Sequence, residues 1–303
     1  MAKRPQGIEY VRRRLRSPAA HCSSLLTAAR DGFSVLELLI VMGVVSVLTA
    51  ILLPAIGATR EAARQLQCKN QLKQIGLALH NYHDICGSFP AGWQWEATKT
   101  SAYGWVVPLL PFLEQRPIYD RTYRNLLLTH PHNTVVRQTS IGLLLCPSDT
   151  TAPTFMLAWE DESAGSSGPL FELPTANYFG VFGTNEPDEL NPPPTGDGTF
   201  IELRPIRLIE LQRGSSNTII VGERTMARVP STWLGVDRQG ADANCRLVGN
   251  AWTSPNCDLC DECEFASRHP GGANFLWGDG RVEAVSQQID SREYQRLARR
   301  ADD

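Results

Sequence analysis

The chain has 303 residues, which is room for one large domain or two ordinary ones. With 42% hydrophobic and 20% charged residues it is not disordered throughout, and its mean hydropathy of −0.22 excludes a protein with many membrane spans. The formal net charge of −3 provides no global basic field, so no nucleic-acid partner is expected.

Charge is distributed unevenly along the chain. Residues 1–32 carry seven basic and two acidic side chains, whereas the remainder carries 22 basic and 30 acidic ones. Residues 38–56 contain no charged side chain, and as a helix these 19 residues extend about 28 Å, close to the bilayer core of about 30 Å. The basic flank predicts a cytoplasmic N-terminus. We therefore expect a single-pass protein of the cytoplasmic membrane whose C-terminal domain lies outside, in the periplasm or at the cell surface.

The junction before the apolar run is distinctive. A secretory signal has a shorter apolar segment, and a plain signal anchor leaves the carboxylate of Glu37 unexplained unless it extends to the interface. Residues 32–38, Gly-Phe-Ser-Val-Leu-Glu-Leu, resemble the type IV prepilin cleavage and methylation motif. The resemblance implies cleavage after Gly32 by a prepilin peptidase and methylation of Phe33. Glu37 then pairs with the terminal amine of a neighbouring pilin-like subunit, although a leader of 32 residues is long for this class.

The helix is expected to continue beyond the membrane and to span residues 33–86, with its transmembrane part at about 33–56. Six side chains spaced alternately four and three residues apart form one apolar face, which predicts packing against a sheet: Cys68, Leu72, Ile75, Leu79, Tyr82 and Cys86. Gly87 and Pro90 end the helix.

Residues 87–303 are expected to form an exported α+β domain with a mixed or antiparallel sheet. Short apolar runs between turn residues predict strands at Trp105–Leu113, Gly142–Cys146, Ala176–Phe182, Thr218–Gly222, Asn274–Trp277 and Arg281–Val285. Residues 160–169 and 186–198 read as surface loops, and residues 291–300 as a short helix capped by Asp290.

A second resemblance lies near the C-terminus, where nine residues separate His269 from Asp279-Gly280. This spacing is similar to the H-X9-DG signature of prepilin-type processing-associated proteins, which carry the DUF1559 domain. Four other stretches resemble the same family: residues 67–76, 79–84, 146–149 and 216–223. The resemblance covers residues 32 to about 290 and implies no established biochemical activity.

The signature itself predicts a hairpin in which Gly278-Asp279-Gly280 supplies the positive φ values of a tight turn. His269 is expected to hydrogen-bond into this hairpin. The alternatives are a catalytic or ligand-binding His269/Asp279 pair and a calcium-stabilised loop.

Seven of the eight cysteines follow the leader, and an exported location permits disulfides. On one helix Cys68 and Cys86 are about 27 Å apart and cannot bond, so Cys68 is expected to pair with Cys146. A further group of four could bind zinc, or resemble part of an iron–sulfur pattern, but their acidic neighbours favour two disulfides: Cys245, Cys257, Cys260 and Cys263.

His80, His83 and Asp84 at the helix end are expected to pack and cap rather than to bind a metal. No nucleophile elbow, Walker A loop or dinucleotide fingerprint is present. We therefore expect no enzyme and no cofactor. The sequence favours a pilin-like or pseudopilin-like structural protein, with membrane lipid, the prepilin peptidase and other pilin-like subunits as partners. A surface binding module sorted by the anchor, or an exported enzyme using His269 and Asp279, are the alternatives.

Overall fold

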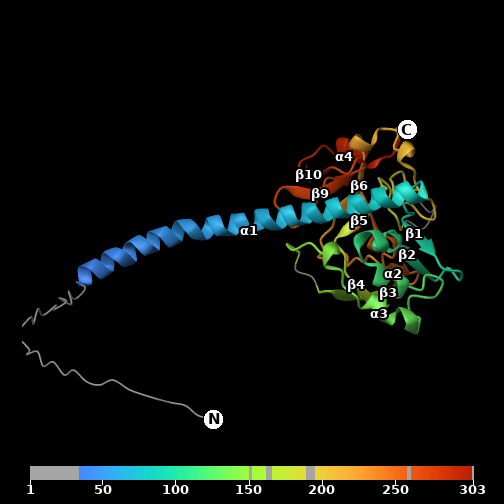
Figure 1. The fold of residues 1–303 in the computed structure, drawn as a ribbon, viewed down its shortest axis with the longest axis horizontal. Coiled ribbons are helices and arrows are strands. Elements are labelled where there is room, and N and C mark those ends of the chain that lie inside the picture. Colours follow the sequence, from blue (N-terminus) through green and yellow to red (C-terminus); the bar gives the residue numbers. More distant parts are fainter. Residues whose placement is uncertain (1–33, 150–151, 162–165, 189–194, 258–260, 302–303) are drawn as a thin grey trace, which may run out of the picture. The chain divides into compact units, whose positions relative to one another are not determined.

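The structure is a computed structural model that describes residues 34–149, 152–161, 166–188, 195–257 and 261–301 (Figure 1). The chain separates into two compact units, Met1–Leu53 and Pro54–Asp303. Gly32 and Phe33, the residues of the expected cleavage site, lie outside the described residues.

The first described element is helix α1, Val35–Cys86. It begins with a capping box: the Ser34 hydroxyl accepts from the Leu36 N–H, and the Glu37 carboxylate accepts from the Ser34 N–H at 3.0 Å. Its apolar side chains are exposed as far as Leu53. Among the described helices, α1 is the one long and apolar enough to cross a membrane, which fits a single-pass membrane protein.

The later part of α1 belongs to the second unit and is buried along one face. Cys68, Leu72, Ile75 and Leu79 are each at most 1% exposed, which confirms the predicted stripe. The stripe ends earlier than predicted, because Cys86 is exposed. The core of the domain therefore stops about one turn before the helix does.

The central sheet of the domain has five strands in the order β10-β9-β6-β5-β8. Its antiparallel strands are β5 (Tyr178–Gly183), β6 (Ile219–Glu223), β9 (Gly272–Trp277) and β10 (Val282–Ser286), and β8 (Val248–Asn250) pairs parallel with β5. The predicted mixed sheet and its four main strands are confirmed within one or two residues.

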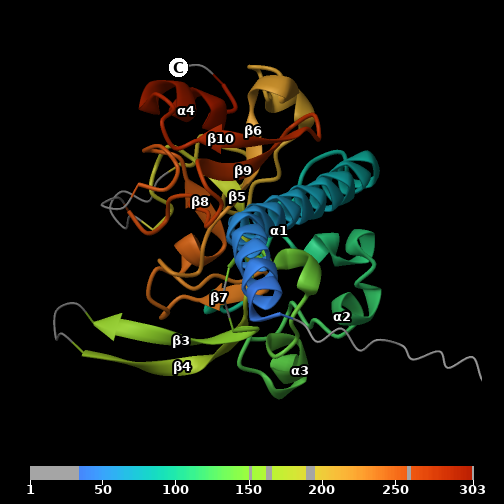
Figure 2. The ribbon, with the colours of Figure 1, turned by 90° about the vertical axis from the view of Figure 1, so that its left-hand side faces the viewer.

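Alternating side chains of this sheet enter two separate cores, as the period of two along a strand requires. Tyr178 and Leu276 belong to the core that contains the α1 stripe. Their chain neighbours Phe179 and Phe275 pack instead with Tyr294 of helix α4, Ser291–Ala298. The sheet thus lies between the second part of α1 and α4 (Figure 2).

Two smaller sheets complete the domain: β1 (Trp93–Trp95), β2 (Ser101–Gly104) and β7 (Gly235–Asp237), and the pair β3 (Thr154–Asp161) and β4 (Ser166–Pro174). The β3–β4 pair corrects the predicted loop at residues 160–169. Two short helices, α2 (Arg116–Asp120) and α3 (Thr134–Arg137), lie between β2 and β3.

Two predicted strands are wrong. Residues 107–113 and 142–144 form 3-10 helices instead. In the first, Pro108 and Pro111 lack the N–H groups that a sheet ladder needs, so this apolar run packs into the core as a helix. The segment 186–198 has no regular element in its described part.

The predicted C-terminal hairpin is confirmed. β9 and β10 are antiparallel, and Gly280 has φ +83° in the connecting turn. The Asp279 carboxylate accepts from the Arg281 N–H at 2.9 Å, which stabilises the turn. Asp290 caps α4 by accepting from the N–H groups of Arg292 and Glu293.

Candidate functional site: a buried cluster of thiols, imidazole and carboxylates

Four segments far apart in the sequence meet beneath the second part of α1. Cys68 comes from α1, Cys146 from the chain just after the 3-10 helix Gly142–Leu144, Glu223 from the end of β6 and His269 from the loop before β9. One donor atom from each of the four lies within 4.8 Å of the others, and all four residues are buried. We call this group the thiol–imidazole cluster.

The two sulfurs of the cluster are neighbours. Cys68 Sγ lies 2.8 Å from Cys146 Sγ, and both cysteines are free thiols. The sequence predicted a disulfide between Cys68 and Cys146; the structure brings the two residues together but does not contain that bond. Asn177 helps to position Cys146, because its side-chain oxygen accepts from the Cys146 N–H at 2.9 Å.

His269 joins the thiols to two carboxylates. Its Nε2 lies 3.5 Å from Cys146 Sγ and 3.7 Å from Glu223 Oε1, and its Nδ1 lies 2.7 Å from Glu61 Oε1. The prediction that His269 bonds into the hairpin turn is thus wrong. The imidazole instead lies at the opposite end of β9, where it contacts α1.

Both carboxylates are held by further donors. Glu61 accepts from Arg64 Nη2 at 2.6 Å and from the Ser148 hydroxyl at 2.9 Å. Glu223 is 2% exposed and accepts from the backbone and side-chain N–H groups of Asn274 at 2.9 and 3.0 Å. Because these hydrogen bonds fix the carboxylate oxygens that face His269, its imidazole has one preferred orientation.

Charge in the cluster is separated between Cys146 and His269. The hydrogen bond from the Cys68 thiol, aided by the one from His269, outweighs burial and lowers the pKa of Cys146 to about 5. The same hydrogen bond, together with burial, raises the pKa of Cys68. Burial opposes protonation of His269, but Cys146, Glu223 and Glu61 outweigh it and raise its pKa to about 9. Both shifts favour a thiolate at Cys146 beside an imidazolium at His269.

Sequence reasoning missed the two carboxylates. Glu61 lies seven residues before Cys68, which is two helical turns and hence the same face of α1. That spacing was the available signal. Glu223 closes an apolar strand, and only the fold shows that its side chain points into the cluster rather than to solvent.

Three of the four stretches that resemble the prepilin-associated family, and the histidine of the signature, converge here. Cys68, Cys146, Glu223 and His269 each belong to one of the matching stretches or to the H-X9-DG signature. The stretch 146–149 contributes again through Asp149, whose carboxylate accepts from Arg268 at 2.7 Å. Sequence similarity that is scattered along the chain is thus gathered in one place.

Asp279 and Gly280 do not belong to this site. They follow the far end of β9, and a six-residue strand separates them from His269 by roughly 20 Å. The Gly280 carbonyl accepts from Lys73 Nζ of α1 at 2.7 Å. The two halves of the signature therefore fasten α1 at two separate points.

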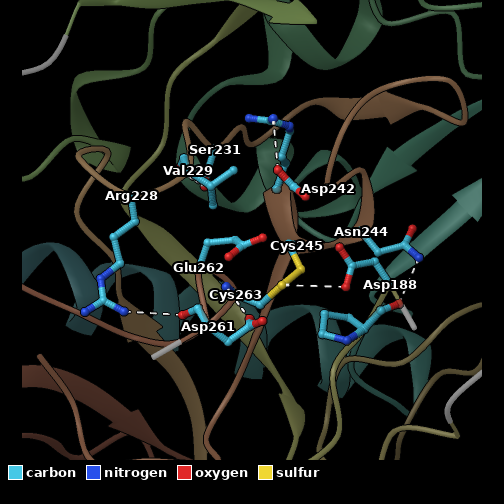
Figure 3. Close-up of a disulfide and its surroundings, with 12 residues drawn as sticks. Asp188, Arg228, Val229, Ser231, Asp242, Asn244, Cys245, Asp261, Glu262 and Cys263 are labelled. Atoms are coloured by element: carbon cyan, nitrogen blue, oxygen red, sulfur yellow. Dashed lines mark hydrogen bonds and ion pairs between the residues drawn. A yellow bond between two sulfur atoms is a disulfide. The ribbon is translucent and has the colours of Figure 1, made fainter. Parts of the chain in front are cut away.

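The second group of cysteines contains a disulfide between Cys245 and Cys263, with Cα atoms 4.9 Å apart (Figure 3). This bond removes two ligands of the zinc site considered from the sequence and supports the disulfide alternative. Cys257 is also disulfide-bonded, and Cys260 lies outside the described residues. Asp188 points toward the Cys263 sulfur in Figure 3, at 3.8 Å.

The histidines at the end of α1 have structural contacts. His83 Nε2 accepts from the Leu208 N–H at 3.2 Å, and the rings of His80 and His83 both pack on Phe89. Neither histidine belongs to a group of potential metal ligands among the described residues.

The model of a family of proteins of unknown function, DUF1559, matches residues 57–292, well over half of the chain. The chain belongs to the DUF1559 family. The match begins just before Glu61 and contains every residue of the thiol–imidazole cluster, so this DUF1559 domain includes the second part of α1. No curated protein and no solved structure is significantly similar to the chain.

Proposed function

We propose that this DUF1559 protein is a membrane-anchored, pilin-like structural protein, a subunit or accessory of a surface filament or a type II secretion-like apparatus. The observation that carries the proposal is the division of α1. The helix is exposed and apolar from Val35 to Leu53, whereas from Cys68 to Leu79 its apolar face is buried in the domain. One helix thus offers an exposed apolar surface between Val35 and Leu53 and a later part that is packed in the domain.

In this proposal a prepilin peptidase cuts after Gly32, and Phe33 becomes the methylated N-terminus. Glu37 supports assembly because its contact within the chain, the capping bond to Ser34, uses one carboxylate oxygen, Oε2. A carboxylate has two oxygens. The second can accept from the terminal amine of a neighbouring subunit, a pairing that offsets the cost of a charge near the membrane.

The remaining partners follow from the same arrangement. The apolar part of α1 meets lipid of the cytoplasmic membrane, and the basic leader keeps the N-terminus inside, so the domain lies outside. No nucleic-acid partner is proposed. An enzymatic role is not part of the proposal, since His269 and Asp279 lie at opposite ends of β9 and cannot act on one substrate atom.

Crosslinking in the membrane tests the proposal. In a Cys86→Ser background, which removes the exposed native thiol, Val44→Cys is introduced into the exposed apolar helix and membranes are treated with a short thiol crosslinker. A subunit gives a crosslinked dimer, because one thiol per chain can join two chains. Adding Glu37→Ala is the matched control and should reduce the dimer while leaving the processed mass unchanged. A monomer band alone, or a mass that retains the leader, would contradict the proposal.

A further inference from the structure

We infer that Cys68 and Cys146 close into a disulfide by thiol–disulfide exchange, with Cys146 as the attacking thiolate, Cys68 as the resolving thiol, and Glu61 and His269 as the pair that activates Cys146. The bond fastens α1 to the domain. This inference does not depend on whether the protein polymerises.

The geometry distinguishes the two thiols. Cys146 is 7% exposed and has the imidazole of His269 at 3.5 Å, whereas Cys68 is fully buried. Glu61, at 2.7 Å from the other ring nitrogen, keeps the imidazole oriented and protonated. A thiolate, not a thiol, attacks a disulfide, so the cysteine beside the imidazolium reacts first.

The exchange takes place in two steps. The Cys146 thiolate attacks one sulfur of an oxidant of the disulfide class, RSSR, which breaks the RS–SR bond and forms Cys146–S–S–R. His269 gives its proton to the departing RS⁻. Cys68 then transfers its proton to the neutral imidazole and attacks Cys146 Sγ, which forms Cys68–Cys146 and releases the second RS⁻. That thiolate receives the proton from His269, so two electrons reduce RSSR to two RSH.

A metal ion is the competing occupant, since two thiols, an imidazole and a carboxylate are also a zinc ligand set. Two thiolates and the carboxylate of Glu223 would leave the site at −1 around Zn²⁺ and a neutral imidazole, since Arg64 compensates the charge of Glu61, and buried uncompensated charge is costly. The sulfurs are also 2.8 Å apart, whereas tetrahedral zinc holds them about 3.8 Å apart.

A second pair of cysteines in the domain supports an oxidising compartment for this protein. The same domain already contains the Cys245–Cys263 disulfide, and disulfides persist where proteins are exported. The Cys68–Cys146 bond would close a loop of 78 residues between α1 and the domain. Closing a loop of this length with a disulfide should raise the melting temperature of the domain by about 10 °C relative to the protein in which both cysteines are reduced.

The first test determines the state of the thiols. Full-length protein is extracted from membranes with an alkylating agent present, and its peptides and zinc content are measured. We expect a Cys68–Cys146 crosslinked peptide, with Cys86 alkylated as the internal reference for a free thiol. Alkylation of both Cys68 and Cys146, or one equivalent of zinc per chain, would overturn the inference.

The second test assigns the roles with the reduced full-length protein and oxidised glutathione. Cys68→Ser, which keeps a hydrogen-bond donor beside Cys146 but cannot form a disulfide, should accumulate a mixed disulfide at Cys146, whereas Cys146→Ala should leave Cys68 largely unreacted. Burial slows the reaction of a thiol by the same factor at every pH. The change of the reaction rate with pH therefore reports the pKa of the thiol, and it is the readout. Cys146 should react almost as fast at pH 6 as at pH 8, whereas an ordinary thiol loses about a hundredfold.

His269→Gln should slow the reaction of Cys146 at pH 6 at least tenfold and have little effect at pH 9. Glu61→Gln should shift the profile in the same direction by less, and it serves as the second variant if His269→Gln does not fold. His132→Gln, which alters an exposed histidine outside the cluster, is the matched control. A profile of Cys146 that matches that of Cys86, or one that His269→Gln leaves unchanged, would refute the activation by Glu61 and His269.

Discussion

Two adjacent glycines connect the loop of His269 to β9, and they allow the role of this loop to be tested. Gly271 and Gly272 have φ +90° and +154°. A Cβ on Gly271 would meet nothing within 4 Å. A Cβ on Gly272 would lie 2.9 Å from the carbonyl carbon of Val285, and nearer still to its oxygen, on the neighbouring strand β10.

The two alanine variants should therefore differ in cost. Gly271→Ala introduces only the unfavourable backbone conformation, about 1–2 kcal/mol. Gly272→Ala adds a contact between backbone atoms that can be relieved only if β9 and β10 part by about 1 Å, which breaks the pairing of Gly272 with Ser286. Losing a hydrogen bond of about 1 kcal/mol on top of strain of about 1–3 kcal/mol gives about 2–4 kcal/mol in total.

Urea denaturation of the full-length protein in detergent micelles, followed by tryptophan fluorescence, measures both variants against the wild type. The expected order of stability is wild type, Gly271→Ala, then Gly272→Ala, with equal dependence on urea. Equal destabilisation by the two substitutions would refute the proposed close approach of β9 to β10. A neutral Gly272→Ala would also show that His269 is not positioned by this strand pairing.

Three further predictions concern other parts of the chain. Glu37→Ala should leave cleavage after Gly32 intact, as the mass of the mature N-terminus would show, but lower the yield of oligomers; an unchanged yield would count against the subunit role. Asp290→Ala should destabilise the domain by about 1 kcal/mol in urea denaturation, because the capping carboxylate accepts from two N–H groups of α4. In the reduced protein, the raised pKa of His269 contributes stability that is complete below pH 6.5 and is lost as the pH rises through about 9. The lowered pKa of Cys146 contributes stability that is complete above pH 9 and is lost as the pH falls through about 5, so the two offset each other between pH 6.5 and 9. His269→Gln should therefore expose a rise in the urea midpoint from pH 6.5 to 8 that the wild type lacks, because the hydrogen bond from Cys68 still lowers the pKa of Cys146. A level midpoint in this variant would disprove the lowered pKa of Cys146.

Local patterns in the sequence were sufficient for the elements that depend on neighbours in the chain. The apolar run and the stripe from Cys68 to Leu79 predicted α1, because burial of one helix face follows a period near 3.6. The turn at Gly280 predicted the β9–β10 hairpin. The run at residues 107–113 misled the prediction, since apolar content alone does not distinguish a buried 3-10 helix from a strand.

The sequence by itself determined the long apolar N-terminal helix, the α+β class and the family, and it selected Cys68, Cys146 and His269 as separate points of interest. Only the tertiary structure decided that these residues are one site and that Asp279 is not part of it. The physical reason is that His269 and Asp279 lie at opposite ends of an extended strand, whereas α1 passes over the sheet and brings Glu61 and Cys68 to the end where His269 lies. Sequence separation fixes the distance between His269 and Asp279. The approach of Glu61 and Cys68 to His269 depends instead on packing between segments more than two hundred residues apart.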